Sequence, residues 1–412
     1  MNNYHLTKIK QHFRNNSLDN IKEELSKELL KLGPVIKPGA NIALAVGSRG
    51  IKNLALVVKE VAEFIRENNA NPFIIPAMGS HGDATAEGQA EILAGYGITE
   101  KTIGVPVRSS MEVVELPQAT PQYPVFMDKN AYESDGIILI NRIKPHTDYH
   151  GKYESGLVKM SVLGLGKHMQ ASAIHRYGVY GLTALIPLAA EQILSTGKIL
   201  GGIALVENAY DETMLINAVK ANDFFEQEPV LLEIARKNMP SFPIDDIDVL
   251  IIDEAGKDIS GVGIDPNVIG RIKIAGQQEP DKPKIKAIVV LNLTENSHGN
   301  AIGIGLADVI TKRLFDKIDF SSTYTNVITS TFLERAKIPV VAANDKEAFE
   351  TALRSCGYLK EGGEKIIRIK DTLHLDEMYI SKAILDIING SDGIRSIQEV
   401  EMFNGTNEFN PF

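Results

Sequence analysis

The sequence predicts an α/β protein made of two α/β domains whose sheets are mainly parallel. Short apolar runs alternate with segments of helical periodicity through the first half of the chain, which is typical of a parallel sheet covered by helices. The 412 residues exceed what one hydrophobic core usually serves, and the alternation starts again near residue 245. We therefore expect a first domain over residues 1–244, a second over 245–373, and a last segment, 374–412, that packs back on the first domain.

The first domain is expected to begin with a helix over residues 19–32, where apolar side chains recur at helical spacing up to Gly33-Pro34. A second helix is expected over 54–65, and a third is expected to start near Thr85. Three short apolar runs predict buried strands, at residues 42–46, 73–77 and 136–140.

The second domain is expected to follow a linker at residues 240–246. Apolar runs predict its strands, at residues 248–252, 286–291 and 339–342. Helical spacing predicts its helices, at residues 305–317, 345–355 and 379–388.

The composition excludes several classes of function. Apolar residues make up 44% and charged residues 23% of the chain, and the net charge of −10 is spread along it without a basic patch, so nucleic acid is not an expected partner. We find no apolar run long enough for a bilayer and no apolar core of a secretory signal, which favours a cytoplasmic protein without a membrane partner. Cys356 is the only cysteine, so any metal must be held by histidine, carboxylate or a bound cofactor.

Chemically active side chains follow the three strands predicted in the first domain. Ligands of parallel sheets bind beyond the carboxyl ends of the strands. The loops at these ends carry Arg49, His81 and His146, so we expect the three side chains to converge although the sequence separates them.

Residues 141–175 hold four of the nine histidines, including His146 and His175, with Lys159 among them. Histidine titrates near neutral pH and is a common metal ligand, so the cluster suggests proton transfer, metal chemistry or both. A polar loop with incidental histidines is the alternative. Lys159 lies between apolar residues and is either a desolvated nucleophile or a lysine that extends along a helix surface.

The second domain has two glycine-rich loops. Residues 256–263 precede Arg271 and Lys273, whose positive charges could hold a carboxylate. Residues 296–300 form a turn that could bind an anion at a helix N-terminus, although a plain loop explains it equally well.

These residues together resemble the nickel-dependent lactate racemase family over most of the chain. The resemblance is carried by an ordered set of Arg, His, His, Lys and His and by no single motif. The matching pieces are Gly47-Ser48-Arg49, Pro76-Ala77-Met78-Gly79-Ser80-His81-Gly82, Lys144-Pro145-His146, Ser155-Gly156 with Lys159, and His175.

The resemblance implies an isomerase, a racemase or epimerase of 2-hydroxy acids, with its active site in a cleft between the two domains. It implies a nickel pincer nucleotide, made by cofactor-maturation enzymes, that is attached to Lys159 through a thioamide and whose nickel is ligated by His175. The reaction would be reversible hydride transfer from C2 of the substrate to the cofactor, with His81 and His146 as bases on the two sides. Arg49, with Lys273 or Arg271, would fix the substrate carboxylate.

The chain also departs from the family. The spacing from His146 to Lys159 is longer than in lactate racemase, and the chain has no tryptophan. The longer loop contains the polar residues Asp148, Tyr149 and His150, which favours a substrate more polar than lactate, an aldonate such as gluconate, or malate. Two other interpretations stay open at this point: a non-catalytic protein that binds small acids, and a cofactor-free metal hydrolase or dehydratase.

Overall fold

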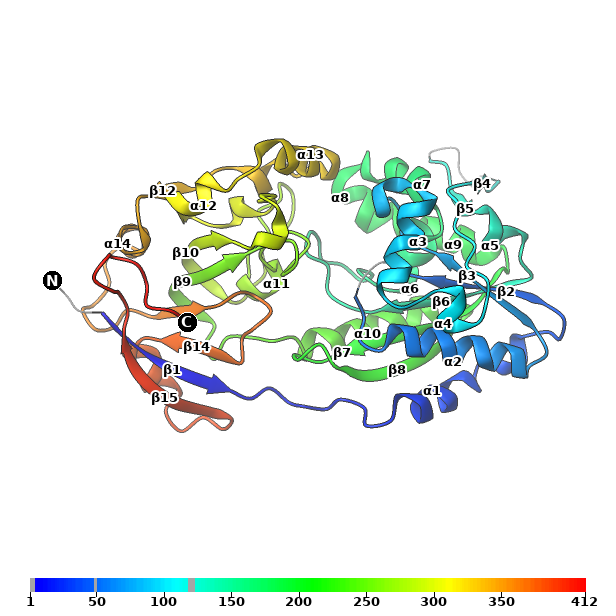
Figure 1. Cartoon of the computed structure of the whole chain (residues 1–412), viewed down its shortest axis with the longest axis horizontal. Coiled ribbons are helices and arrows are strands. Elements are labelled where there is room, and N and C mark those ends of the chain that lie inside the picture. Colours follow the sequence, from blue (N-terminus) through cyan, green and yellow to red (C-terminus); the bar gives the residue numbers. More distant parts are fainter. Residues whose placement is uncertain (1–3, 48–49, 118–122) are drawn as a thin grey trace. The chain divides into compact units, whose positions relative to one another are not determined.

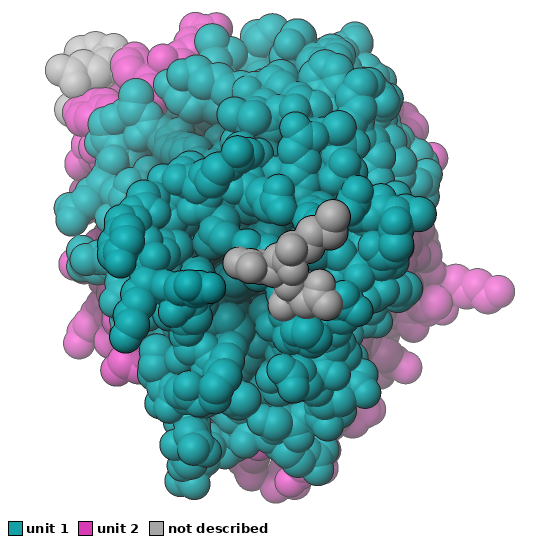
Figure 2. All heavy atoms as spheres, turned by 90° about the vertical axis from the view of Figure 1, so that its left-hand side faces the viewer, with its two compact units in different colours: residues 1–13, 240–412 teal, residues 14–239 magenta. Residues whose placement is uncertain are grey.

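A computed structural model describes residues 4–47, 50–117 and 123–412 of the chain. It divides into two compact units, each with its own sheet and core (Figures 1 and 2). Unit 1 comprises residues 1–13 and 240–412, and unit 2 comprises residues 14–239. The mixed α/β class with mainly parallel sheets is therefore confirmed, and the chain changes unit near the expected linker.

Unit 2 contains a five-stranded sheet of order β3-β2-β6-β7-β8, in which only β8 is antiparallel to its neighbour. Its strands are β2 (Asn41–Val46), β3 (Asn71–Pro76), β6 (Gly136–Arg142), β7 (Ile199–Glu207) and β8 (Thr213–Lys220). Leu44 lies opposite Ile74 and Ile138, so the predicted strands are neighbours in register. Both faces of these strands are buried, which explains why they form continuous apolar runs in the sequence. A two-stranded sheet pairs β4 (Val113–Glu115) with β5 (Phe126–Asp128).

Two of the helices expected in unit 2 begin at residues that cap them. Thr85 caps α3 by accepting a hydrogen bond from the amide of Gly88, and Asn20 caps α1 through Glu23. The α-helices are α1 (Ile21–Leu29), α2 (Leu54–Glu67), α3 (Ala86–Gly95), α4 (Glu100–Ile103), α5 (Lys129–Glu133), α6 (Leu157–Lys159), α7 (Lys167–His175), α8 (Gly178–Tyr180), α9 (Ile186–Ser195) and α10 (Phe224–Lys237). Shorter turns are η1 (Gly33–Val35), η2 (Gly82–Ala84), η3 (Met160–Gly164), η4 (Gly181–Leu185) and η5 (Ala221–Asp223), of which η3 and η4 are π-helical.

One helical stretch of unit 2 differs from expectation. Within the described residues, the stretch 178–195 is long and apolar enough to cross a membrane by length and composition. It contains α8, η4 and α9, and α9 packs against α6 and η3. Core helices of soluble proteins meet the same criterion.

Unit 1 contains an eight-stranded sheet of order β12-β11-β10-β9-β13-β14-β1-β15. The first five strands are parallel, and β14, β1 and β15 are antiparallel to their neighbours. The strands are β1 (His5–Gln11), β9 (Asp246–Ala255), β10 (Lys284–Leu293), β11 (Val309–Thr311), β12 (Val340–Ala342), β13 (Ile366–Ile369), β14 (Glu377–Ile380) and β15 (Ile394–Glu401). Separate hydrophobic clusters cover the two faces of this sheet.

The prediction that residues 374–412 pack back on the first domain was wrong. Strand β14 pairs with β13, and both β14 and β15 pair with β1 at the N-terminus, so the two ends of the chain complete one sheet. The reason is physical: Ile9 stands opposite Met378, and burial of such apolar partners decides the pairing. Local periodicity carries no information about a partner so distant in the sequence.

The helix predicted over residues 305–317 was also wrong. This segment forms a 3₁₀ turn, the strand β11, and then the short helix α12. The β-branched run Val309-Ile310-Thr311 favours a strand and interrupts the helical spacing. The helices and turns of unit 1 are α11 (Pro266–Ile269), η6 (Glu295–Ser297), η7 (Ile304–Leu306), α12 (Lys312–Asp316), α13 (Phe320–Ser330), η8 (Leu333–Ala336), α14 (Asp345–Ser355) and α15 (Lys382–Ile388).

Candidate functional site

The candidate site lies in unit 2, in the loops that follow β3 and β6 and in the helical segment of residues 157–175. Arg49, in the loop after β2, lies outside the described residues. The other predicted residues of this unit can be located, and they are His81, His146, Lys159 and His175.

The loop after β6 is organised around a buried carboxylate, Glu154. Its side chain is fully buried and accepts hydrogen bonds from the amides of His146 at 2.6 Å and Gly151 at 2.9 Å. It also contacts Nδ1 of His150 at 3.3 Å and pairs with Arg236 of α10. Burial alone would raise the pKa of Glu154, but the hydrogen bonds from His150 and the amides hold it below the ordinary value. Glu154 therefore stays ionised and fixes the backbone of His146.

The imidazole of His146 lies on the ring of Tyr149, with ring centroids 4.5 Å apart and planes inclined by 33°. Its Nδ1 accepts a hydrogen bond from the amide of Asp148 at 3.0 Å, and a carboxylate oxygen of Asp148 lies 3.9 Å from the same nitrogen. A neutral ring whose Nδ1 accepts must carry its proton on Nε2. The backbone amide of Asp148 thus favours the Nε2-protonated tautomer of His146.

Lys159, the last residue of α6, meets the same tyrosine. Its Nζ is 5.3 Å from the centroid of the Tyr149 ring, and this ring is fully buried. Tyr149 is therefore the common wall against which His146 and Lys159 both pack.

His175 ends α7, sixteen residues after Lys159 by number. Burial lowers the pKa of His175, the positive charge of Lys159 lowers it further, and Asp148 acts in the opposite direction. These interactions place His175 within electrostatic reach of both side chains. A neutral imidazole is the form that binds metal, so this environment suits a ligand.

Glu228, which lies against the backbone at the start of α6, is a residue that sequence reasoning missed. Glu228 is fully buried on α10, and its Oε2 accepts a hydrogen bond from the amide of Val158 at 2.8 Å. A Cβ at Gly156 would lie 2.4 Å from the carboxyl carbon, so only glycine leaves room for it. Burial raises the pKa of Glu228 to about 7, against the opposing effect of the Val158 and Leu157 amides. Its place on the apolar face of α10, four residues after Phe224, was the available signal.

His81 is exposed in the turn after β3. The turn packs on η3, because the amide of Gly79 bonds to the carbonyl of Gly164 at 3.5 Å. Gly79 has a φ of +62°, and a Cβ there would lie 3.1 Å from the carbonyl oxygen of Leu163. The structure thus brings the loop of His81 onto the helical segment of residues 157–175.

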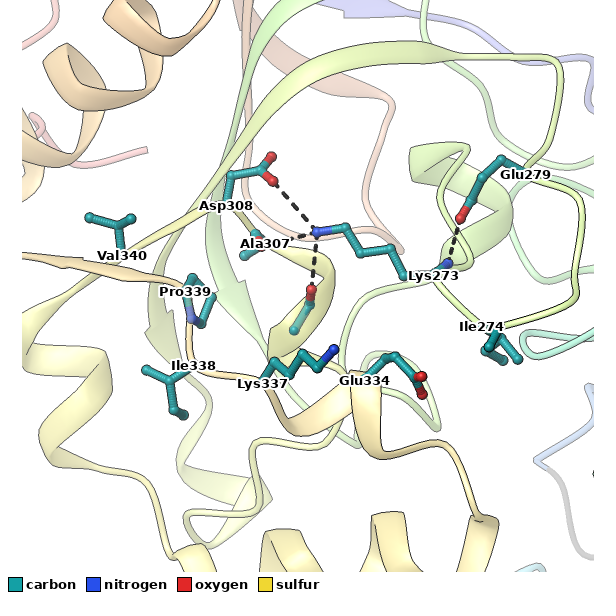
Figure 3. Close-up of a pocket in the computed structure, with 12 residues that line it drawn as sticks. Lys273, Ile274, Glu279, Ala307, Asp308, Glu334, Lys337, Ile338, Pro339 and Val340 are labelled. Atoms are coloured by element: carbon teal, nitrogen blue, oxygen red, sulfur yellow. Dashed lines mark hydrogen bonds and ion pairs between the residues drawn. The ribbon is translucent and has the colours of Figure 1, made fainter.

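Arg271 and Lys273 lie in unit 1 and are described there by themselves. Arg271 donates to Asp308 at 2.6 Å and to the carbonyls of Leu306 and Ile285, both at 2.9 Å, which makes it part of the framework of this unit. The ammonium of Lys273 is turned toward Asp308 and the carbonyl of Gly305 (Figure 3). Lys273 lines a pocket of about 660 Å³, and burial lowers its pKa. Of the two cations, Lys273 is the one beside open space.

The two glycine-rich loops of unit 1 are bound to each other. Thr294 donates to Asp258 at 2.6 Å, and Asn296 donates to the other oxygen of Asp258 at 3.3 Å. The turn η6 that follows β10 is only three residues long. The carboxylate of Asp258 therefore occupies the place where the sequence suggested an external anion.

Comparisons with known proteins support the fold. No protein-family model matches the sequence, and no curated protein matches it significantly. The lactate racemase apoprotein from Thermoanaerobacterium thermosaccharolyticum is similar in structure, with a TM-score of 0.51 and 13% identity over 89% of this chain and 98% of that chain. A structural-genomics target from Thermotoga maritima has a TM-score of 0.49 and 14% identity over 79% of this chain and 84% of that chain. The chain therefore has the fold of lactate racemase, the family that its motifs resemble.

Proposed function

We propose that this protein is an isomerase that inverts C2 of a 2-hydroxy acid with a nickel pincer nucleotide attached to Lys159. The observation that carries the proposal is the gathering of three differently suited side chains around Tyr149 and Asp148. These side chains are a histidine beside an acidic residue, His146, a lysine on an aromatic wall, Lys159, and a half-buried imidazole of lowered pKa, His175.

The donors of the chain fit this cofactor. Among the described residues there is no group of three or more His, Cys, Asp or Glu side chains able to hold a metal ion. A single half-buried imidazole, His175, suits a nickel ion whose remaining donors come from an organic group, and Lys159 is the amine proposed for the covalent bond. When bound, the cofactor would supply the acceptor and donor of the C2 hydrogen.

The chain's own task is to move the hydroxyl proton of the substrate. In the described geometry Nδ1 accepts from the Asp148 amide, so a neutral His146 carries its proton on Nε2 and can donate it to a substrate oxygen. To accept a proton on Nε2 as the proposed base, His146 must exchange this hydrogen bond for one from Nδ1–H to the Asp148 carboxylate, which lies 3.9 Å away. His81 is the proposed second base, on the loop that packs against η3. Arg49 and Lys273 are the proposed partners of the substrate carboxylate.

A substrate more polar than lactate remains our proposal, and Asp148 is what supports it. His150 bonds to Glu154, and Tyr149 is fully buried, so these two residues shape the loop. Asp148 is partly exposed beside His146 and is the acidic group best placed to meet further hydroxyls. In a panel with loaded enzyme, gluconate or malate should be turned over faster than lactate. Lactate as the best substrate, with polyhydroxy acids inert, would contradict this.

The test of the proposal is intact mass and nickel content of protein produced together with the cofactor-maturation enzymes. We expect one adduct on Lys159, about one nickel per chain, and loss of both in Lys159→Ala. Lys152→Ala is the matched control, because Lys152 is an exposed lysine in the preceding loop. An unmodified, nickel-free protein that is nevertheless active, or one that only binds small acids, would refute the proposal.

A further inference from the structure

A buried ion pair joins the helical segment that carries Lys159 and His175 to the end of β5. The side chains of Lys167 and Asp128 are both 0% exposed, and their charged atoms are 3.0 Å apart. Lys167 is the first residue of α7 and has a φ of +54°, which few residues other than glycine adopt. Burying such a pair stabilises a fold little or not at all, so its presence calls for another explanation.

The ammonium of Lys167 connects three elements. Besides Asp128 at the end of β5, it donates to the carbonyl of Pro76, the last residue of β3, and to Oε1 of Gln89 on α3 at 3.3 Å. Burial lowers the pKa of Lys167, and Asp128 opposes this effect. The end of β3 is thereby fixed to the first residue of α7.

Gln89 links Lys167 to the loop of His81 through hydrogen bonds. Gln89 is fully buried, and its Nε2 donates to the carbonyl of Gly79 at 2.9 Å and to the carbonyl of His81 at 3.2 Å. Gly82 and Gly88 lie so close that a Cβ on either would come within 2.5 Å of the other's backbone. The loop therefore lies directly on α3, and one amide group holds both carbonyls that flank Ser80.

We propose that Gln89, oriented by Lys167, is the positioning residue of His81. The amide oxygen accepts from the lysine, so its nitrogen must point toward the loop, and this fixes the backbone of His81 relative to the segment of residues 157–175. The inference rests on the proposed function, in which His81 is a base that must stand at a set distance from the cofactor's attachment. A misplacement of about 1 Å can cost roughly 100-fold in rate.

The test uses the variant Gln89→Glu. A carboxylate at this position keeps an acceptor for Lys167 but cannot donate to the carbonyls of Gly79 and His81. We expect kcat of the loaded enzyme to fall roughly 10- to 100-fold with KM nearly unchanged. Gln278→Glu, the same substitution at an exposed position of unit 1, should behave as wild type.

A double-mutant cycle separates positioning from general damage. In a His81→Ala background, Gln89→Glu should lower kcat by no more than about twofold, because the side chain that it positions is gone. Independent losses that multiply in the double variant would overturn the inference. Gln89→Met, which has a similar volume and lacks the donor, is the second variant if the glutamate impairs folding.

Hydrogen exchange on the apoprotein gives a measurement that needs no cofactor. Residues 78–85 should exchange faster in Gln89→Glu than in wild type, and residues 157–164 should not. Unchanged exchange over 78–85 contradicts the inference. If exchange changes as expected but wild type carries no adduct on Lys159, or His81→Ala keeps full activity, the proposed function fails while the structural role of Gln89 stands.

Discussion

Replacing Glu228 by glutamine should change the pH dependence of stability in a defined direction. The folded-state pKa of Glu228 is raised from 4.5 to about 7, chiefly by burial. The folded state therefore binds this proton more tightly than the unfolded chain does. The contribution of the group to stability is greatest below pH 4.5 and is lost as the pH rises through 7. Each pH unit corresponds to roughly 1.4 kcal/mol, so ionised Glu228 costs the folded state about 3 kcal/mol above pH 7.

Glutamine removes that cost while keeping an oxygen for the amide of Val158. The stability of Glu228→Gln relative to wild type should therefore rise by about 2 kcal/mol between pH 5 and pH 8. Any hydrogen bond weakened by the substitution adds an offset that does not vary with pH. The change with pH, and not the absolute difference, is the quantity that reports on Glu228.

Urea unfolding followed by far-ultraviolet circular dichroism, with variant and wild type paired at each pH, measures this difference. Glu226→Gln is the matched control, because Glu226 lies on the same helix and is exposed. A difference between Glu228→Gln and wild type that stays constant from pH 5 to pH 8, or that moves in the opposite direction, would refute the reasoning. It would mean that Glu228 is hydrated or paired in solution.

Four further outcomes follow from the same geometry. His81→Ala and His146→Ala should each lower racemisation roughly 100- to 10,000-fold, to a residual rate, while nickel remains bound, and nickel loss measured by mass spectrometry would instead make that residue a ligand. His175→Ala should lose nickel but keep the covalent adduct, and because the pKa of His175 is lowered, wild type should retain nickel below pH 6.5 on dialysis. Asp148→Asn should lower kcat roughly 10- to 100-fold with little change in KM, since the Nδ1 proton that His146 needs when it acts as a base would lose its carboxylate acceptor. Lys167→Met should lower the free energy of unfolding by about 3 kcal/mol in urea titrations, because it leaves a buried carboxylate unpaired.

Most of unit 2 could be predicted because its information is local. The strands at residues 42–46, 73–77 and 136–140 are buried on both faces, so each is a continuous apolar run bounded by turn residues. The helix that starts at Thr85 has its cap in the sequence. Where a β-branched run interrupts helical spacing, as at 309–311, both patterns are present and tertiary pairing decides.

The residues of the candidate site also differ in how far the sequence reveals them. His146, Lys159 and His175 belong to one continuous segment, so their spacing is visible in the sequence. In the sequence, Tyr149 is recognisable only as a polar residue of the longer loop. Its burial depends on how this loop folds around Glu154, which accepts hydrogen bonds from the amides of His146 and Gly151.

The residues that sequence reasoning missed share a physical property, which is that they act on backbone and not on substrate. Gln89 holds the carbonyls of the His81 loop, and Glu228 holds the first amides of the helix that carries Lys159. Such residues need a buried polar side chain in the right place, and a motif of catalytic side chains does not include them. Both lie at buried positions of their helices, beside apolar residues that are also buried. A polar residue on the apolar face of a helix beside a candidate site is therefore the sequence feature from which a positioning role can be inferred.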